Sequence, residues 1–251
     1  MKQQFIPSIY SYCDRWCERC SFTKRCSTYE GLYSLSGGKP EFSNRAFWDS
    51  IAEQLKKAKN LLSQVANIPG LGFLDVLSEE ERAAWEEKEE HIKKQGRAHV
   101  LGAISDQYVK LTKAFLLARE NYDPKIRQME DEFRCGFKSR DDIQGEVACL
   151  KDCLQVIHWY VFFIDAKLQR ALRGKRVDDD KHVSMRDADG SAKVALIGID
   201  RSISAWVQFY ELMPDSEDMA IQALSLLSQL KQKTLAEFPH AMEFKRPGFD
   251  D

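Results

Sequence analysis

The sequence lacks a net charge of either sign, because 37 Lys and Arg oppose 39 Asp and Glu for a formal charge of −2. Without a basic excess, the bulk composition does not point to nucleic acid or an anionic membrane as a partner. No apolar run reaches the length of a membrane span, since Val161–Ile164 is followed by Asp165 and Lys167. The first residues also lack the apolar core of a signal peptide. We therefore predict a cytoplasmic protein that does not bind a membrane, and the composition does not favour nucleic acid as a partner.

Histidine is scarce, with five residues in 251. Di-iron carboxylate bundles need a Glu three residues before a ligating His. The residues at that spacing before His91, His99 and His158 are Lys88, Gly96 and Gln155. The sequence therefore excludes the usual di-iron motif at these three positions.

Apolar residues recur at helical spacing through most of the chain, and we find no convincing strand and no internal repeat. One predicted helix begins at Ser43 or Asn44, and a second begins after Ser78, where Ser78 and Glu81 form a capping box. Asp123-Pro124 interrupts the second helix. Three further helices are predicted: Ser139 to about Arg173, Asp189 or Ser191 to just before Pro214, and Ser216 to Glu237.

Two of these helices carry patterns typical of helix packing. From Ile143 to Leu168, apolar residues alternate by steps of four and three, as along the seam of a bundle helix. Small residues form one side of the next helix and favour close approach of a neighbour: Ala192, Ala195, Gly198, Ser202 and Ala205. The predicted fold class is all-α, an up-down bundle of four to five long helices preceded by a short Cys-rich metal-binding segment.

Three regions follow from this pattern. Residues 1–44 form the Cys-rich metal-binding segment and a connector, for which turns and at most a short helical turn are expected. Residues 45–238 form the helical bundle, with the longest loop from Lys175 to Asp189. Residues 239–251, together with the preceding Phe238, hold three aromatic side chains without helical period, so we expect this tail to pack on the body.

Cysteine is concentrated near the start of the chain. Four of the seven cysteines, Cys13, Cys17, Cys20 and Cys26, fall within 14 residues with the spacing C-x3-C-x2-C-x5-C. An odd total in a protein of this size argues against a secreted disulfide scaffold. In a reducing compartment, such a cluster indicates metal ligands.

Zinc and a [4Fe-4S] cluster are the two candidate cofactors for these four thiols. Structural zinc sites use two C-x2-C pairs separated by a dozen or more residues, whereas only one such pair occurs here. A [4Fe-4S] cluster presents four corners to a compact run of ligands and suits the spacing better. Four cations beside the thiols favour an anionic centre: Arg15, Arg19, Lys24 and Arg25. Trp16 and Phe22 are expected to screen the centre from water. Solubilisation of an exposed loop is the alternative explanation for the cations.

Two local resemblances concern this segment. Cys13-x3-Cys17-x2-Cys20 has the spacing seen in radical S-adenosylmethionine enzymes, which implies a (β/α) barrel and an open iron. Here Arg19 stands where that family usually has an aromatic residue, Cys26 adds a fourth ligand, and no βα alternation follows. Cys17-x2-Cys20-x5-Cys26 resembles the C-terminal ligand run of iron–sulfur nucleases related to the bacterial recombination nucleases. That resemblance implies a type of metal centre, because the β-sheet nuclease core is not visible in this sequence.

Polar residues inside the apolar helices form a second candidate site. Lys151, His158 and Asp165 share one helix edge, and Asp200-Arg201 interrupts the apolar stripe of the next helix. Buried charges need partners, so we expect Arg201 to pair with His158, Asp165 or Glu146. Such a network either fixes the helix register or lines a small-molecule or proton-handling pocket.

Three other cysteines lie in the predicted bundle. Cys149 and Cys153 are one helical turn apart, and Cys135 is near in sequence. They are interpreted either as free core cysteines or as a second metal or redox site.

These observations lead to three functional hypotheses. The first is a [4Fe-4S] redox protein, for electron transfer or for redox or iron sensing, with a redox partner protein and a possible homo-oligomeric state. The second is a zinc-stabilised helical interaction module that binds protein or nucleic acid. The third is a helical enzyme with an interhelical polar pocket and a structural metal centre.

Overall fold

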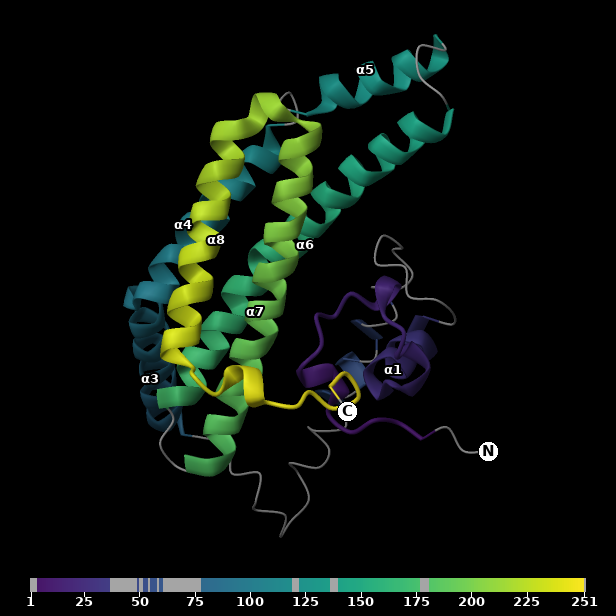
Figure 1. Ribbon diagram of the computed structural model, residues 1–251. Helices are drawn as coiled ribbons and strands as arrows, with labels where there is room; N and C mark the ends of the chain where they lie inside the picture. Colours follow the sequence, from purple (N-terminus) through teal and green to yellow (C-terminus); the bar gives the residue numbers. More distant parts are fainter. Residues whose placement is uncertain are drawn as a thin grey trace. The chain divides into compact units, whose positions relative to one another are not determined.

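The computed structural model describes residues 4–36, 49, 52–53, 55–57, 59–60, 78–118, 122–135, 140–176 and 181–250 (Figure 1). The structure is mostly helical (84 %) and the described residues contain no strand, which confirms the all-α class. Packing divides the chain into two compact units. One comprises Met1–Glu89 with Arg246–Asp251, and the other comprises Glu90–Lys245.

The larger unit is built from helices that pack side by side (Figure 1). Helix α6 packs on α7 and α4, α8 packs on α4 and α7, and α5 packs on α6. The helices are α3 (Glu79–Ala98, which begins in the smaller unit), α4 (Val100–Leu117), α5 (Asp123–Arg134), α6 (Arg140–Arg176), α7 (Lys181–Leu212) and α8 (Glu217–Glu237). Two short 3-10 turns, η6 (Pro214–Ser216) and η7 (Ala241–Glu243), contact α7.

Helices α6 and α7 approach closely because of the small residues predicted to allow it. Ala192, Ala195 and Ser202 are fully buried on α7. A Cβ placed on Gly198 would lie 3.1 Å from Cδ1 of Tyr160 and 3.2 Å from Cγ1 of Ile164, both on α6. The four-three seam of α6 faces inward as expected, with Leu150, Ile157, Ile164 and Leu168 fully buried.

An aromatic cluster joins α4 and α7. The ring of Trp206 lies 5.5 Å from Phe115 and 5.6 Å from Phe209 between centroids. The Nε1–H of Trp206 donates to the hydroxyl of Tyr108 at 3.2 Å, so the one polar atom of the indole has a partner in the core. Trp206, Tyr108 and Phe209 are fully buried.

Some predicted helix boundaries are wrong. The second predicted helix is broken at His99, whose Nδ1 accepts from the amide of Leu101 at 3.3 Å and caps α4. Helix α7 begins at Lys181, so much of the predicted loop from Lys175 to Asp189 is helical. At His99, the side-chain cap favours the start of a new helix over continuation of the preceding one. Near the start of α7, Asp187 pairs with Arg170 of α6 at 2.6 Å.

Other boundaries agree with the sequence. Ser78 and Glu81 form the predicted capping box, with the Ser78 amide donating to Glu81 Oε2 at 2.8 Å and the Glu81 amide donating to Ser78 Oγ at 3.1 Å. The helix predicted from Ser43 or Asn44 lies mostly outside the described residues. The described positions between 49 and 60 are helical, although Leu55, expected on an apolar stripe, is 66 % exposed.

One described helix, Gly145–Lys175, is long and apolar enough to cross a membrane by length and composition, contrary to the sequence expectation. About a third of its most apolar window is buried (33 %). Core helices also pass this test, because their buried seam raises the apolar content. Within the described residues, this stretch belongs to α6 and packs against α4 and α7.

The smaller unit starts with three 3-10 turns, η1 (Ile9–Ser11), η2 (Cys17–Arg19) and η3 (Thr23–Arg25). Helix α1 (Ser27–Ser36) follows and contacts η3. Its ten residues exceed the single helical turn expected, and it continues through Gly31, which the sequence suggested as a break. The amide of Ile6 donates to the carbonyl of Arg25 at 3.0 Å and joins the two ends of this segment.

Candidate metal centre

The 3-10 turns place the four N-terminal cysteines. Cys17 begins η2 and Cys20 follows its end, while Cys26 follows the end of η3. Side chains three residues apart eclipse each other on a 3-10 helix, so η2 turns Cys17 and Cys20 to the same side. The C-x2-C spacing and the turn type together bring these two thiols onto one face.

All four cysteines line a single cavity of the smaller unit. Aromatic residues make up much of the remaining wall, and the expected screening residues are among them: Tyr10, Trp16, Phe22, Tyr29 and Phe249. Each of the four cysteines is partly exposed and forms no disulfide. The sequence cluster is therefore also a spatial cluster.

The size of the cavity permits a fit test for the two candidate cofactors. It leaves about 20 Å³ open to the centres of water-sized atoms. About 10–15 Å³ by this measure holds one water, so the cavity has room for about one water as it stands. Binding of a metal group would require the surrounding side chains to move apart.

The separation of the donor groups bears on the same question. Among the described residues, no group of three or more His, Cys, Asp or Glu side chains could hold one metal ion. A tetrahedral zinc site with bonds of about 2.3 Å holds its sulfurs only about 3.8 Å apart. A cubane cluster spreads its thiolates, because each binds a different iron. In the described residues the thiols are not gathered around one metal-ion position, and both zinc and a [4Fe-4S] cluster stay candidates.

The thiols affect one another electrostatically. Burial, followed by the neighbouring Cys13, Glu18, Cys20 and Cys26, raises the pKa of the Cys17 thiol to about 11. Four thiolates at this spacing would repel each other without a cation between them. Binding of a metal group would remove that cost and release protons.

Main-chain groups are directed at the sulfurs. The amide of Phe22 donates to Cys20 Sγ at 3.4 Å, and Cys13 Sγ donates to the carbonyl of Tyr10 at 3.6 Å. Amide bonds to sulfur stabilise thiolate charge and tune the potential of an iron–sulfur centre.

The four predicted cations are exposed around this segment: Arg15, Arg19, Lys24 and Arg25. Arg15 lines the cavity with a left-handed backbone (φ 58°). The guanidinium of Arg19 lies 3.9 Å above the ring of Trp16. Both arginines are therefore placed by specific local geometry, and Arg15 is beside the thiols.

One residue in the wall of the cysteine cavity, Phe249, was not predicted from the sequence. Phe249 lies 223 positions after Cys26 in the sequence but belongs to the same compact unit and lines the cavity. Its ring meets Phe22 edge to face, with centroids 5.0 Å apart. The only sequence signal was the aromatic content of the tail, which did not indicate where the tail packs.

The polar residues predicted for an interhelical pocket have separate partners. Arg201 donates to the hydroxyl of Tyr160, and Asp200 pairs with Lys231 at 2.7 Å. Asp165 Oδ1 accepts from Arg97 Nη1 and from Ser105 Oγ, both at 2.7 Å. His158 is exposed and Glu146 is partly buried. Asp165, one of the three partners expected for Arg201, thus pairs with residues of α3 and α4.

We predict that Asp165 has a structural role that Asp200 does not share. Asp165→Ala removes a carboxylate that is 13 % exposed and accepts from both Arg97 and Ser105, so the free energy of unfolding should fall by about 2 kcal/mol. Asp200→Ala is the matched control, because its ion pair is at the surface and should contribute less than about 1 kcal/mol. Denaturant unfolding measures both, and equal losses would contradict this assignment.

The other three cysteines do not line the cavity of the smaller unit. Cys135 is exposed, Cys149 is partly buried and Cys153 is buried. Burial, followed by the neighbouring Cys149, raises the pKa of the Cys153 thiol to about 12, and its Sγ donates to Gln208 Oε1 at 3.7 Å. Cys153 is therefore a protonated core thiol.

A second cavity, of about 450 Å³, lies on the larger unit between α4 and the start of α8. Leu111, Phe115 and Met219 contribute apolar surface, and Asp215 and Asp218 contribute carboxylates. It contains no thiol and no histidine, and no pattern in the sequence predicted it.

The chain finds no match among protein-family models, curated proteins or solved structures. Its function therefore has to be argued from the site itself.

Proposed function

We propose that this chain is a redox protein that binds one [4Fe-4S] cluster through Cys13, Cys17, Cys20 and Cys26, carried by an up-down bundle of helices. The observation that supports this most is the shared cavity, which all four cysteines line together with aromatic side chains. The compact C-x3-C-x2-C-x5-C spacing suits a cubane better than a structural zinc site, which typically uses two separated C-x2-C pairs.

The number of ligands decides what kind of chemistry is proposed. With four thiolates, every iron has a protein ligand and none is open to a substrate. A cubane cluster exchanges single electrons, so electron transfer to a partner protein, or redox or iron sensing, follows more naturally than Lewis-acid catalysis. The chain's own part is to hold the thiolates, to direct the Phe22 amide at Cys20 and to exclude water with aromatic walls.

Metal analysis tests this proposal directly. Protein purified without oxygen should be brown, with a broad visible absorption band and about four irons and four sulfides per chain. Reduction with dithionite should bleach the band. A colourless protein with one zinc per chain would overturn the redox proposal and favour the zinc-stabilised interaction module.

A further inference from the structure

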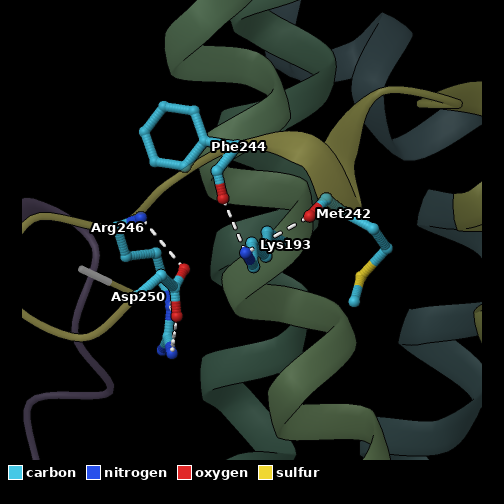
Figure 2. A network of polar contacts seen from close by, with 5 residues as sticks. All are labelled: Lys193, Met242, Phe244, Arg246 and Asp250. Atoms are coloured by element: carbon cyan, nitrogen blue, oxygen red, sulfur yellow. Dashed lines mark hydrogen bonds and ion pairs between the residues drawn. The ribbon is translucent and has the colours of Figure 1, made fainter.

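The segment Arg246–Asp250 forms a closed loop in the unit that contains the four cysteines. The main-chain amide of Arg246 donates to Asp250 Oδ2 at 3.0 Å, and Nη2 of the Arg246 side chain donates to Asp250 Oδ1 at 2.8 Å (Figure 2). The amides of Phe249 and Asp250 both donate to the carbonyl of Arg246, at 3.1 and 3.2 Å. The Arg246 and Asp250 side chains are only 16 % and 20 % exposed, so water competes little for this ion pair.

Two residues at the tip dock this loop on the cysteine segment. Gly248 has a left-handed backbone (φ 76°), and a Cβ there would lie 2.7 Å from Ile6 Cδ1 and 3.2 Å from Ile9 Cδ1. Glycine is required on both counts, for the backbone angle and for the close approach. Phe249 then packs edge to face on Phe22 and forms part of the cavity wall.

The chain just before the loop is held by a buried lysine of α7. Lys193 is 9 % exposed, and its amine donates to the carbonyl of Phe244 at 2.6 Å and to that of Met242 at 3.3 Å (Figure 2). This anchor fixes the main chain of the larger unit at Met242 and Phe244.

We infer that Arg246–Asp250 is a cover over the four-cysteine cavity, which limits the access of water and small reagents to the sulfurs. The effect of this cover on a bound metal group rests on the proposed cluster. Its effect on the access of reagents to the thiols does not depend on a metal. The apolar shell around a metal site controls its contact with solvent, and hence both its potential and its release. An open cover would expose the centre, and a closed cover would retain it.

Thiol labelling tests the cover in the full chain without requiring a metal. Reduced, metal-free Phe249→Ala protein should react with iodoacetamide at Cys13, Cys17, Cys20 and Cys26 about fivefold faster than wild type, because the lost ring pair favours the open loop. Mass spectrometry reads each site separately. Exposed Cys135 is the internal reference and should keep its rate. Phe162→Ala is the matched control, since Phe162 is 53 % exposed on α6 and does not line the cavity.

A second variant and a second readout complete the test. Gly248→Ala should accelerate labelling in the same way, because its added Cβ meets Ile6. In the metal-loaded protein, a chelator should remove iron about fivefold faster from both variants under anaerobic conditions. Circular dichroism verifies that each variant keeps its helix content.

The possible outcomes separate the two claims. Faster labelling at the four cysteines supports the cover even if the protein proves to contain no iron, which would overturn only the proposed cluster. Unchanged labelling in both variants overturns the cover, whether or not iron is bound.

Discussion

Cys20→Ser is expected to abolish the visible absorption band of the anaerobically purified protein and to lower bound iron from about four to less than one per chain. Cys20 follows η2, is turned to the same side as Cys17 and accepts a bond from the Phe22 amide at 3.4 Å. Serine preserves the size of the side chain but replaces a soft thiolate by a hydroxyl with a much higher pKa, which is a poor ligand for iron.

Cys135→Ser is the matched control for this experiment. Cys135 is exposed and does not line the cavity, so its replacement should leave iron, sulfide and the spectrum unchanged. Retention of a full cluster in Cys20→Ser would remove this residue from the ligand set. A loss of colour in both variants would indicate a general effect of cysteine number.

Trp206→Ala is expected to lower the free energy of unfolding of the helical unit by about 3–5 kcal/mol. The indole is fully buried, contacts the rings of Phe115 and Phe209, and donates to the hydroxyl of Tyr108. Truncation would leave a large cavity and remove one hydrogen-bond partner of the Tyr108 hydroxyl in the core. For a chain of this size, the midpoint of thermal unfolding should fall by roughly 10 °C.

Phe162→Ala serves as control for the aromatic truncation. Phe162 is 53 % exposed on α6, so its replacement should change the free energy of unfolding by about 0.5 kcal/mol or less. Calorimetry or denaturant titration measures both variants. A loss below about 1 kcal/mol for Trp206→Ala would show that the core relaxes into the vacated space, contrary to this prediction.

The amino-acid sequence by itself determined the all-helical class and most helix ends. Periodicity and capping are local signals, and they placed the seam of α6 on Leu150, Ile157 and Ile164 as well as the cap of α3 on Ser78. The gathering of Cys13, Cys17, Cys20 and Cys26 was also predictable, because 14 residues of chain with turns cannot separate their side chains far. Local chemistry was sufficient for these features.

Only the tertiary structure decided which residues far apart in sequence meet. The polar residues of α6 and α7 found separate partners in Arg97, Tyr160 and Lys231, because the rotation of each helix depends on packing that periodicity does not specify. Likewise, nothing local to Phe249 indicates Phe22 as its neighbour. The tail reaches the cysteine cavity through the left-handed turn at Gly248 and its fit against Ile6, and a contact over more than 200 residues leaves no local pattern.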